Sequence, residues 1–182
     1  MSVNISKGKL QVFNPATGKE ISVIPMTSSN ELQIILKNAK EACDYNLSSL
    51  YYRKKLMTRF QKGIVNRMDE FIKTICAETG KKSIEGLMEV FISLEHLKHA
   101  THHVYKALGK RSRRVGIMQI KKAWIEYEAM GVAGIISPWN YPLILTLSPA
   151  VEALLAGNMV VLKPSEQTPL TTKLLKEVWD VS

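Results

Sequence analysis

The sequence predicts an α/β fold in which a helical first half leads into an open parallel sheet. Two short apolar runs, one that starts at Gly131 and is ended by Pro138 and one from Met159 to Leu162, contain small and β-branched residues without polar alternation, which is typical of strands covered on both faces. The residues between them show helical spacing. A strand, a helix and a strand in so short a span form a βαβ unit, so the strands are parallel and joined by a right-handed crossover.

The composition excludes several classes of protein. The 182 residues are 46% hydrophobic and 23% charged, which predicts a soluble globular chain with enough residues to bury a core. No apolar run is long enough to span a membrane, and residues 1–10 lack the apolar core of a signal peptide, so we expect a cytoplasmic protein. Two cysteines without paired spacing indicate neither a disulfide framework nor a zinc site.

Residues 1–26 predict a hairpin, because strand-like runs at residues 10–13 and 20–24 flank a turn at residues 14–18. Residues 27–109 predict a series of helices. Ser28 and Glu31 form a capping box for the first helix, and its apolar face is Leu32, Ile35, Leu36, Ala39 and Cys43.

Three further helices follow in this region. One begins after Ser49, with Tyr52, Leu56, Phe60, Ile64 and Met68 on its apolar face. The next is capped by Asp69 and ends at Gly80, and we expect Cys76 on its apolar stripe to be a buried core thiol like Cys43. The last is a long helix from Ser83 to Leu108, closed by Gly109, with Ile84, Leu87, Met88, Phe91, Leu94 and Leu97 as its apolar positions.

All four histidines lie in the long helix. The spacing of His96, His99 and His103 places them along one side, as a helical zinc site requires. No carboxylate or cysteine at a fixed position completes a coordination shell, so a solvated histidine face is the preferred interpretation and no metal ligand is assigned.

The formal net charge of +9 suits an anionic partner, either a charged cofactor or a nucleic acid. Residues 110–128 carry the densest basic run, which is Lys110, Arg111, Arg113, Arg114, Lys121 and Lys122, inside a strand-like pattern that predicts a protruding hairpin. No aromatic ladder or nucleic-acid module accompanies these residues, so nucleic-acid binding is the weaker alternative.

Residues 129–182 contain the βαβ unit. We expect Ser148 to cap its helix with Pro149 in the first position, and Gly157 to end that helix in a left-handed turn. A final helix is predicted from Pro169 to Val178, capped by Thr168.

Parallel strands end on the same edge of a sheet, where ligands of open α/β folds bind. The loops Pro138-Trp139-Asn140 and Lys163-Pro164-Ser165-Glu166 therefore meet there, although more than twenty residues of sequence separate them. An amide, an indole, an ammonium and a carboxylate suit a polar, sugar-bearing cofactor. The alternative is that Trp139 is a core residue and Lys163 a solvated strand end.

The segment Gly131 to Pro169 resembles the aldehyde dehydrogenase superfamily, whose cofactor-binding half carries Pro-Trp-Asn after one strand and Lys-Pro-Ser-Glu after the next. Weaker matches lie upstream, at Phe13-Asn14-Pro15-Ala16-Thr17-Gly18 and Glu78-Thr79-Gly80-Lys81. The resemblance implies the N-terminal part of that fold, with an incomplete Rossmann-like sheet, and it implies that residues 110–128 serve subunit association in a homo-oligomer.

Enzymes of this family use a cysteine nucleophile and a nicotinamide to oxidise an aldehyde to an acid. The resemblance implies that Asn140 donates its amide to the oxyanion, as the catalytic residue of this chain. It implies that Lys163 and Glu166 hydrogen-bond the adenosine ribose, which favours NAD over the alternative NADP. The implied cofactor contacts are Ile136, Ser137, Pro138, Trp139, Asn140, Lys163, Pro164, Ser165, Glu166 and Gln167.

The chain departs from the family pattern because neither cysteine matches the context of the nucleophile, and the expected glutamate base and glycine turn lie beyond Ser182. We therefore expect an N-terminal piece of an NAD-dependent aldehyde dehydrogenase that is inactive alone. Two alternatives remain: a non-catalytic chain that binds a nucleotide weakly or associates with a full-length relative, and a basic nucleic-acid binder.

Overall fold

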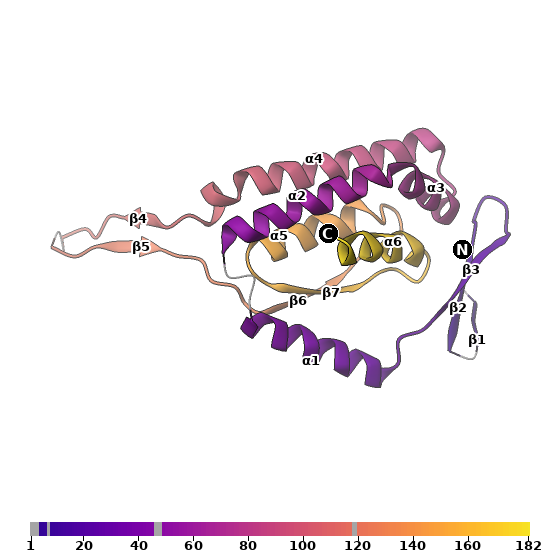
Figure 1. The fold of residues 1–182 in the computed structure, drawn as a ribbon, viewed down its shortest axis with the longest axis horizontal. Coiled ribbons are helices and arrows are strands. Elements are labelled where there is room, and N and C mark those ends of the chain that lie inside the picture. The colour runs from indigo at the N-terminus through magenta and orange to yellow at the C-terminus, as the bar shows by residue number, and fades with distance from the viewer. Residues whose placement is uncertain (1–3, 7, 46–48, 118–119) are drawn as a thin grey trace.

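A computed structural model describes residues 4–6, 8–45, 49–117 and 120–182. Its main body is layered around a two-stranded sheet (Figure 1). Helix α1 packs on one face of the sheet and α5 on the other, and the remaining helices cover α5 and α6. The elements of this body are α1 (Ser29–Tyr45), α2 (Leu50–Asn66), α3 (Met68–Thr79), α4 (Ser83–Leu108), β6 (Val132–Ile136), α5 (Ile144–Leu155), β7 (Met159–Lys163) and α6 (Pro169–Asp180).

The predicted βαβ unit is confirmed. Strands β6 and β7 are parallel, in a register that pairs Val132 with Met159 and Ile136 with Lys163. Gly157 has a φ of +96° after the end of α5, the left-handed turn that the sequence predicts. The helical first half and the incomplete parallel sheet confirm the predicted fold class. The expected full coverage of the strands is wrong, because Gly134, Ile136 and Lys163 are exposed and the other residues of β6 and β7 are only half-buried.

The predicted start of α5 is wrong. The helix begins at Ile144 and Pro149 lies inside it, because Leu143 and Leu147 are fully buried and extend the apolar face by one turn. Pro149 removes one N–H from the helical ladder, but it lies on the exposed side. Ser148 consequently does not cap the helix; its Oγ lies 2.7 Å from His96 Nε2 on α4 instead.

The N-terminal hairpin is confirmed as β2 (Lys9–Phe13) and β3 (Glu20–Pro25), paired antiparallel. A third strand that the sequence did not predict, β1 (Asn4–Ser6), pairs with β2. The turn between β2 and β3 is fixed by Asn14, whose Oδ1 accepts the backbone N–H groups of Ala16 at 2.9 Å and Thr17 at 3.2 Å.

Local capping determines where the helices begin and end. Glu31 N–H donates to Ser28 Oγ at 3.2 Å and Ser28 N–H donates to Glu31 Oε2 at 2.7 Å, which is the predicted capping box. Asp69 as the cap of α3 is wrong. The N–H of Arg67 still closes α2, so Arg67 alone separates the two helices and is the N-cap of α3. The predicted ends of α3 and α4 are confirmed.

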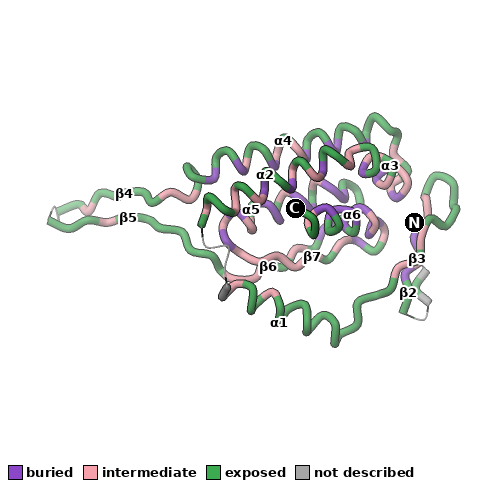
Figure 2. The backbone as a smooth tube through the Cα atoms, in the orientation of Figure 1, coloured by how far each residue is buried: buried purple, intermediate pink, exposed green. Residues whose placement is uncertain are grey.

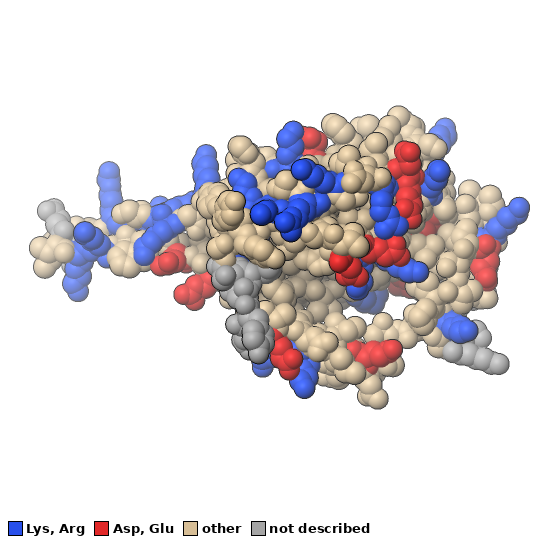
Figure 3. Space-filling view, viewed as in Figure 1, with Lys and Arg blue, Asp and Glu red and all other residues tan. Residues whose placement is uncertain are grey.

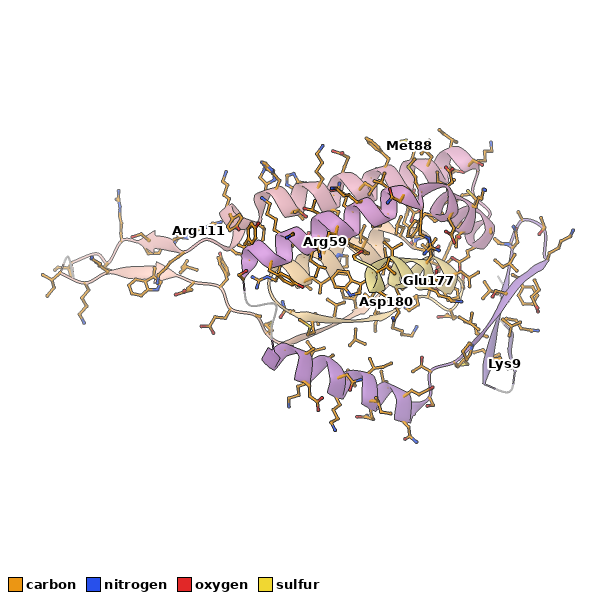
Figure 4. The ribbon with its side chains drawn as sticks, in the orientation of Figure 1. Lys9, Arg59, Met88, Arg111, Glu177 and Asp180 are labelled. Atoms are coloured by element: carbon orange, nitrogen blue, oxygen red, sulfur yellow. The ribbon has the colours of Figure 1, made fainter. Side chains whose placement is uncertain are left out.

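The predicted apolar face of α4 is confirmed at Leu97, which is fully buried, and at Leu94, which packs against the core, but it is wrong in the first half of the helix. Ile84, Met88 and Phe91 are 60%, 49% and 57% exposed, and Met88 points outward from the helix in Figure 4. The helix is apolar on more than one side, and small and polar residues occupy the side that packs on α2, α3 and α5. That buried side is Gly86, Glu89, Val90, Ser93, Leu97, Thr101 and Val104.

The core lies between the helices of the main body, which are coloured as buried along their facing sides in Figure 2. Helix α1 is mostly exposed in the same view, and its predicted apolar face is incompletely covered, with Leu32 and Ile35 each 42% exposed. The expectation of buried core thiols is wrong, because Cys43 and Cys76 are both half-buried.

The predicted hairpin after α4 is present as an arm that extends away from the main body (Figure 1). Its antiparallel strands are β4 (Arg111–Arg113) and β5 (Ala123–Ile125), so the first strand lies earlier than the predicted Val115 and Ile117. Within the described ranges, none of the helices is both long and apolar enough to cross a membrane.

Candidate functional site

The two predicted loops leave adjacent strands at the same edge of the sheet. Ile136 and Lys163 are paired in the parallel register, and Ser137 N–H donates to Lys163 O at 3.1 Å. This backbone hydrogen bond is the only direct contact between the two loops among the hydrogen bonds and ion pairs of the described residues. The structure therefore brings the starts of the loops together, and it does not join Asn140 to Glu166.

The first loop presents its polar and aromatic side chains to solvent. Trp139 is 46% exposed, so it is not a core residue, and Asn140 is exposed as well. Ser137 is buried, and its Oγ accepts a hydrogen bond from Thr146 Oγ1 of α5 at 2.7 Å. Pro138 between them is exposed. The buried serine anchors the loop to the helix that follows it, which leaves Trp139 and Asn140 facing outward.

The second loop carries an ion pair between two of its own side chains. Lys163 Nζ lies 3.7 Å from Glu166 Oε2, and the two side chains are 64% and 54% exposed. Ser165 is buried, and its Oγ accepts from Gln167 N–H at 3.2 Å, which closes the turn. Gln167 Oε1 is buried without a hydrogen-bond partner in the described part of the chain. Pro164 is half-buried. An exposed, solvent-screened pair such as this one contributes little to stability.

The first loop is held from the helical half of the chain by Lys81 and Glu89. Lys81 Nζ donates to Asn140 O at 2.6 Å and to Glu89 Oε2 at 2.9 Å, and it lies 3.8 Å from the centre of the Tyr141 ring. Glu89 Oε1 accepts the N–H of Leu143 at 2.8 Å. The loop and the start of α5 thus rest on one buried carboxylate and its ammonium partner.

The second loop is held in a related way by Glu78 on α3. Its carboxylate accepts from Leu170 N–H at 2.5 Å, from Thr171 N–H at 2.9 Å and from Thr171 Oγ1 at 2.6 Å. These groups belong to the first turn of α6, where backbone N–H groups have no partner within the helix. Burial raises the pKa of Glu78 to about 7, against the lowering effect of these hydrogen bonds.

Sequence reasoning assigned no role to Glu78, Lys81 or Glu89. A signal was present for two of them, because Glu78 and Lys81 lie in the stretch that resembles the family upstream of the sheet. Glu89 also had a signal, since it is an acidic residue within an apolar helical pattern. Buried charges require partners, so such a position predicts a distant cation or N–H group.

A groove of about 430 Å³ lies beside the first loop, between α4 and α5. It is mainly apolar, because the α4 face that the sequence wrongly assigned to the core forms one of its walls. Its charged residues include the paired Lys81 and Glu89. The lining residues are Lys81, Ile84, Glu85, Met88, Glu89, Ile92, Tyr141, Ile144 and Leu145.

The histidines of α4 make contacts with one another and with α5. The rings of His99 and His103 stack at 4.1 Å, and His103 Nδ1 lies 2.9 Å from His99 O. His96 contacts Ser148 through its Nε2. Within the described residues, no three histidine, cysteine, aspartate or glutamate side chains form a group that would hold a metal ion.

The fold and the site define an α/β chain with a candidate ligand-binding edge at the carboxyl ends of two parallel strands. The model of the Aldehyde dehydrogenase family matches residues 3–181. The chain belongs to this family.

Two relatives illustrate the similarity. The putative succinate-semialdehyde dehydrogenase of Mycolicibacterium smegmatis, whose name specifies NADP(+), is 30% identical over 157 residues. These residues are 86% of this chain and 30% of that protein. The 4,4'-diapolycopene-4,4'-dial dehydrogenase of Cytobacillus firmus is 36% identical over 132 residues, which are 71% of this chain and 29% of that protein. The chain spans about a third of the length of these relatives.

Solved structures agree in fold. The aldehyde dehydrogenase of Bartonella henselae matches with a TM-score of 0.85 and 28% identity, over 95% of this chain and 36% of that chain. The succinic semialdehyde dehydrogenase of Streptococcus pyogenes, in complex with NADP+, matches with a TM-score of 0.87 and 17% identity, over 94% of this chain and 37% of that chain.

Proposed function

We propose that this chain supplies the oxyanion donor and part of the dinucleotide site for the NAD(P)-dependent oxidation of an aldehyde to a carboxylic acid. The observation that carries the proposal is the shared edge: the Asn140 loop and the Lys163–Glu166 loop start from paired residues of parallel strands. Family membership supports the class of reaction, and the shared sheet edge supports the position of the site.

Asn140 is the catalytic residue in this proposal. Its side chain is exposed at the loop, while its backbone oxygen is fixed by Lys81. A side-chain amide on a fixed backbone is a preorganised donor for the negative charge that develops on the aldehyde oxygen. The adjacent groove is mainly apolar, which suits the carbon chain of an aldehyde.

The second loop fits the sugar of a dinucleotide, whose nicotinamide supplies the hydride acceptor when it is bound. Lys163 and Glu166 are exposed donors and acceptors at the strand end, and Gln167 Oε1 has no hydrogen-bond partner in the described part of the chain. The remaining contacts in the proposal are Ile136, Ser137, Pro138, Trp139, Pro164 and Ser165. Glu166 favours the two ribose hydroxyls of NAD, because a carboxylate repels a 2′-phosphate.

The cofactor preference has its own test, because relatives are named for NADP and Lys163 supplies a cation near Glu166. We expect tighter binding of NAD than of NADP by calorimetry. Glu166→Gln should narrow the difference, since it removes the repulsion, while Glu177→Gln in the last turns of α6 should leave it unchanged. Tighter binding of NADP by the unaltered chain would remove the NAD assignment.

The nucleophile is not one of the two cysteines of this chain in our proposal. Cys43 Sγ donates to Gly131 O at 3.0 Å beside the sheet, and burial raises the pKa of the Cys76 thiol, which disfavours the reactive thiolate. Since the chain spans about a third of its relatives, we propose that it needs the remaining portion to act and does not oxidise aldehydes alone.

The test is complementation. The chain is combined with a polypeptide covering the remaining part of a relative, and reduced dinucleotide is measured with an aldehyde present. We expect turnover in the mixture, and we expect Asn140→Ala to lower it by about a hundredfold or more, as loss of an oxyanion donor does. Asn38→Ala on exposed α1 is the matched control. Near-normal turnover of Asn140→Ala would refute the role of this residue.

We also propose that the arm at residues 110–128 joins subunits of a homo-oligomer. Trp124 and Tyr127 are each 51% exposed on it, and an isolated two-stranded hairpin gains stability from a covering partner. Basic side chains gather over α2 and along the arm in Figure 3, which keeps nucleic acid as the alternative partner. Sedimentation measures whether the chain associates into an oligomer, and steep salt dependence of DNA binding would support a nucleic-acid partner.

A further inference from the structure

The backbone that carries Asn140 is attached to two residues far upstream in the sequence. Lys81, in the connection between α3 and α4, donates to Asn140 O at 2.6 Å. Glu89, on the second turn of α4, accepts Leu143 N–H at 2.8 Å. The two upstream side chains also bond each other at 2.9 Å, so four groups form one connected network around residues 140–143.

The burial of this network makes the contacts interdependent. The Glu89 side chain is fully buried and that of Lys81 is 16% exposed. Burying a carboxylate is costly unless its charge is compensated by a cation or by hydrogen-bond donors, and here Lys81 supplies the cation and the loop N–H supplies a donor. The loop therefore satisfies the charged pair, and the charged pair fixes the loop.

The contacts constrain both ends of the short segment that leads from β6 into α5. Lys81 lies against the backbone of Asn140 and against the ring of Tyr141, and Glu89 fixes Leu143. From α5, Thr146 Oγ1 contacts both Ser137 Oγ at 2.7 Å and Pro142 O at 2.6 Å. With its flanking backbone held, the side chain of Asn140 leaves the loop from a fixed backbone position.

We infer that Lys81 and Glu89 are positioning residues, which hold the Asn140 amide where the developing oxyanion needs its donor. This inference rests on the proposed function for the role of Asn140. The network itself involves only residues of this chain. A preorganised donor stabilises a transition state because it does not reorganise during the reaction, so loosening the loop should lower kcat rather than weaken dinucleotide binding.

The first experiment measures backbone amide exchange by NMR in the chain as it stands. In Lys81→Met we expect the amide of Leu143, which donates to Glu89, to exchange at least about tenfold faster, while those of Val90 and Leu97 in the buried side of α4 stay protected. Lys81→Arg should restore the slow exchange, since it keeps the donor. Ser148→Ala is the matched control, because it removes another polar contact between α4 and α5 at His96.

Glu89→Gln provides a second variant should Lys81→Met fail to fold. It keeps an oxygen for Leu143 N–H and removes the charge, so we expect faster exchange of the Leu143 amide with α4 still protected. Unchanged exchange of the Leu143 amide, or a loss of protection equally large across α4, would overturn the inference. Neither result depends on whether the chain takes part in aldehyde oxidation.

The second experiment uses the complemented enzyme. We expect Lys81→Met to lower kcat about tenfold with the KM for the dinucleotide unchanged, and Lys81→Arg to recover most of the rate. If the unaltered mixture is inactive, the proposed function fails and the exchange experiment alone decides the network. If Asn140→Ala is inactive while Lys81→Met keeps full kcat, the positioning role falls and the proposed function stands.

Discussion

The two loops at the sheet edge are held by the same kind of residue in two different electrostatic settings. Glu89 holds the first loop and is neutralised by Lys81. Glu78 holds the second through three donors of α6, and in the described part of the chain no lysine, arginine or histidine pairs with it. Both carboxylates come from the helical half and both reach the start of a helix that follows a strand.

The difference between a cation partner at Glu89 and a helix N-terminus at Glu78 predicts how each loop responds to mutation and to pH. A helix N-terminus carries partial positive charge and unpaired N–H groups, so it attracts a carboxylate without a formal cation. At Glu78 the helix N-terminus offsets only part of the cost of burying the charged carboxylate, since the pKa of this residue is raised to about 7. The first loop should therefore respond most to loss of a partner, and the second to protonation.

The largest effect is expected for Glu89→Leu. It leaves the Lys81 ammonium largely buried without its carboxylate and leaves Leu143 N–H without an acceptor, so the free energy of unfolding should fall by about 4 kcal/mol. Urea denaturation of the chain measures this. Adding Lys81→Met to the variant should recover part of the loss because it removes the unpaired cation. A double variant less stable than Glu89→Leu alone would contradict the pairing.

Glu78 should make stability depend on pH. Its pKa is about 7 in the folded chain and 4.5 without burial, so the folded state binds the extra proton. The stabilising contribution is then complete below pH 4.5 and is lost as the pH rises through 7, amounting to about 3 kcal/mol. Glu78→Gln has no carboxylate to titrate at this position. Its free energy of unfolding should therefore rise relative to that of the unaltered chain as the pH is raised from 5 to about 8.

The measurement for Glu78 is the difference in unfolding free energy between Glu78→Gln and the unaltered chain, taken at several pH values. A difference removes the contributions of the other carboxylates. Glu95→Gln, at an exposed position of α4, is the control and should show a flat difference. A flat difference for Glu78→Gln as well would show that the α6 N-terminus compensates the buried charge fully.

The sequence predicted the parts of the fold that depend on neighbouring residues. The Ser28 and Glu31 capping box, the end of α3 at Gly80 and the left-handed Gly157 each follow from short-range backbone chemistry, and the structure bears them out. The parallel strands followed from the composition of the runs at Val132 and Met159. These features involve few residues, so a single sequence contains the evidence for them.

The buried side of α4 could not be predicted from its own spacing. The helix presents apolar residues in several directions, and the side that faces the core includes Glu89 only because Lys81 and Leu143 satisfy it. Leu143 lies 54 positions along the chain from Glu89, so helical periodicity carries no information about the contact. The candidate site shows the same limit: the loops were predicted, and the residues that hold them were not.

A substitution at Gly86 tests whether Glu78 on α3 and Glu89 on α4 are held in fixed positions relative to each other, because Gly86 lies where the two helices meet. A Cβ at this position would approach Cys76 Sγ to 2.9 Å and Ile72 O to 3.3 Å, so Gly86→Ala should force the helices apart at a cost of about 3 kcal/mol. Alanine gains about 1 kcal/mol of helix propensity, so we expect a net loss of about 2 kcal/mol. Gly134→Ala in β6, with no atom within 4 Å, is the control.

Urea denaturation measures the Gly86 variant, and the pH series for Glu78 sharpens it. If α3 and α4 move apart, Glu78 and Glu89 move relative to both loops, and the pH dependence assigned to Glu78 should weaken together with the stability. A variant as stable as the unaltered chain would show that Cys76 turns away at no cost. The two loops would then be attached to independently movable helices.

The smallest effect is expected at an ordinary cap. Ser49 Oγ accepts Tyr52 N–H at 3.2 Å at the start of α2, and Tyr52 is 51% exposed. Ser49→Ala should cost about 1 kcal/mol of unfolding free energy, because the N–H group that loses its acceptor becomes accessible to water. Ser49→Asp keeps an acceptor and should be close to neutral. Thermal denaturation measures both, and a loss in Ser49→Ala as large as that in Glu89→Leu would contradict the distinction between exposed local caps and buried remote ones.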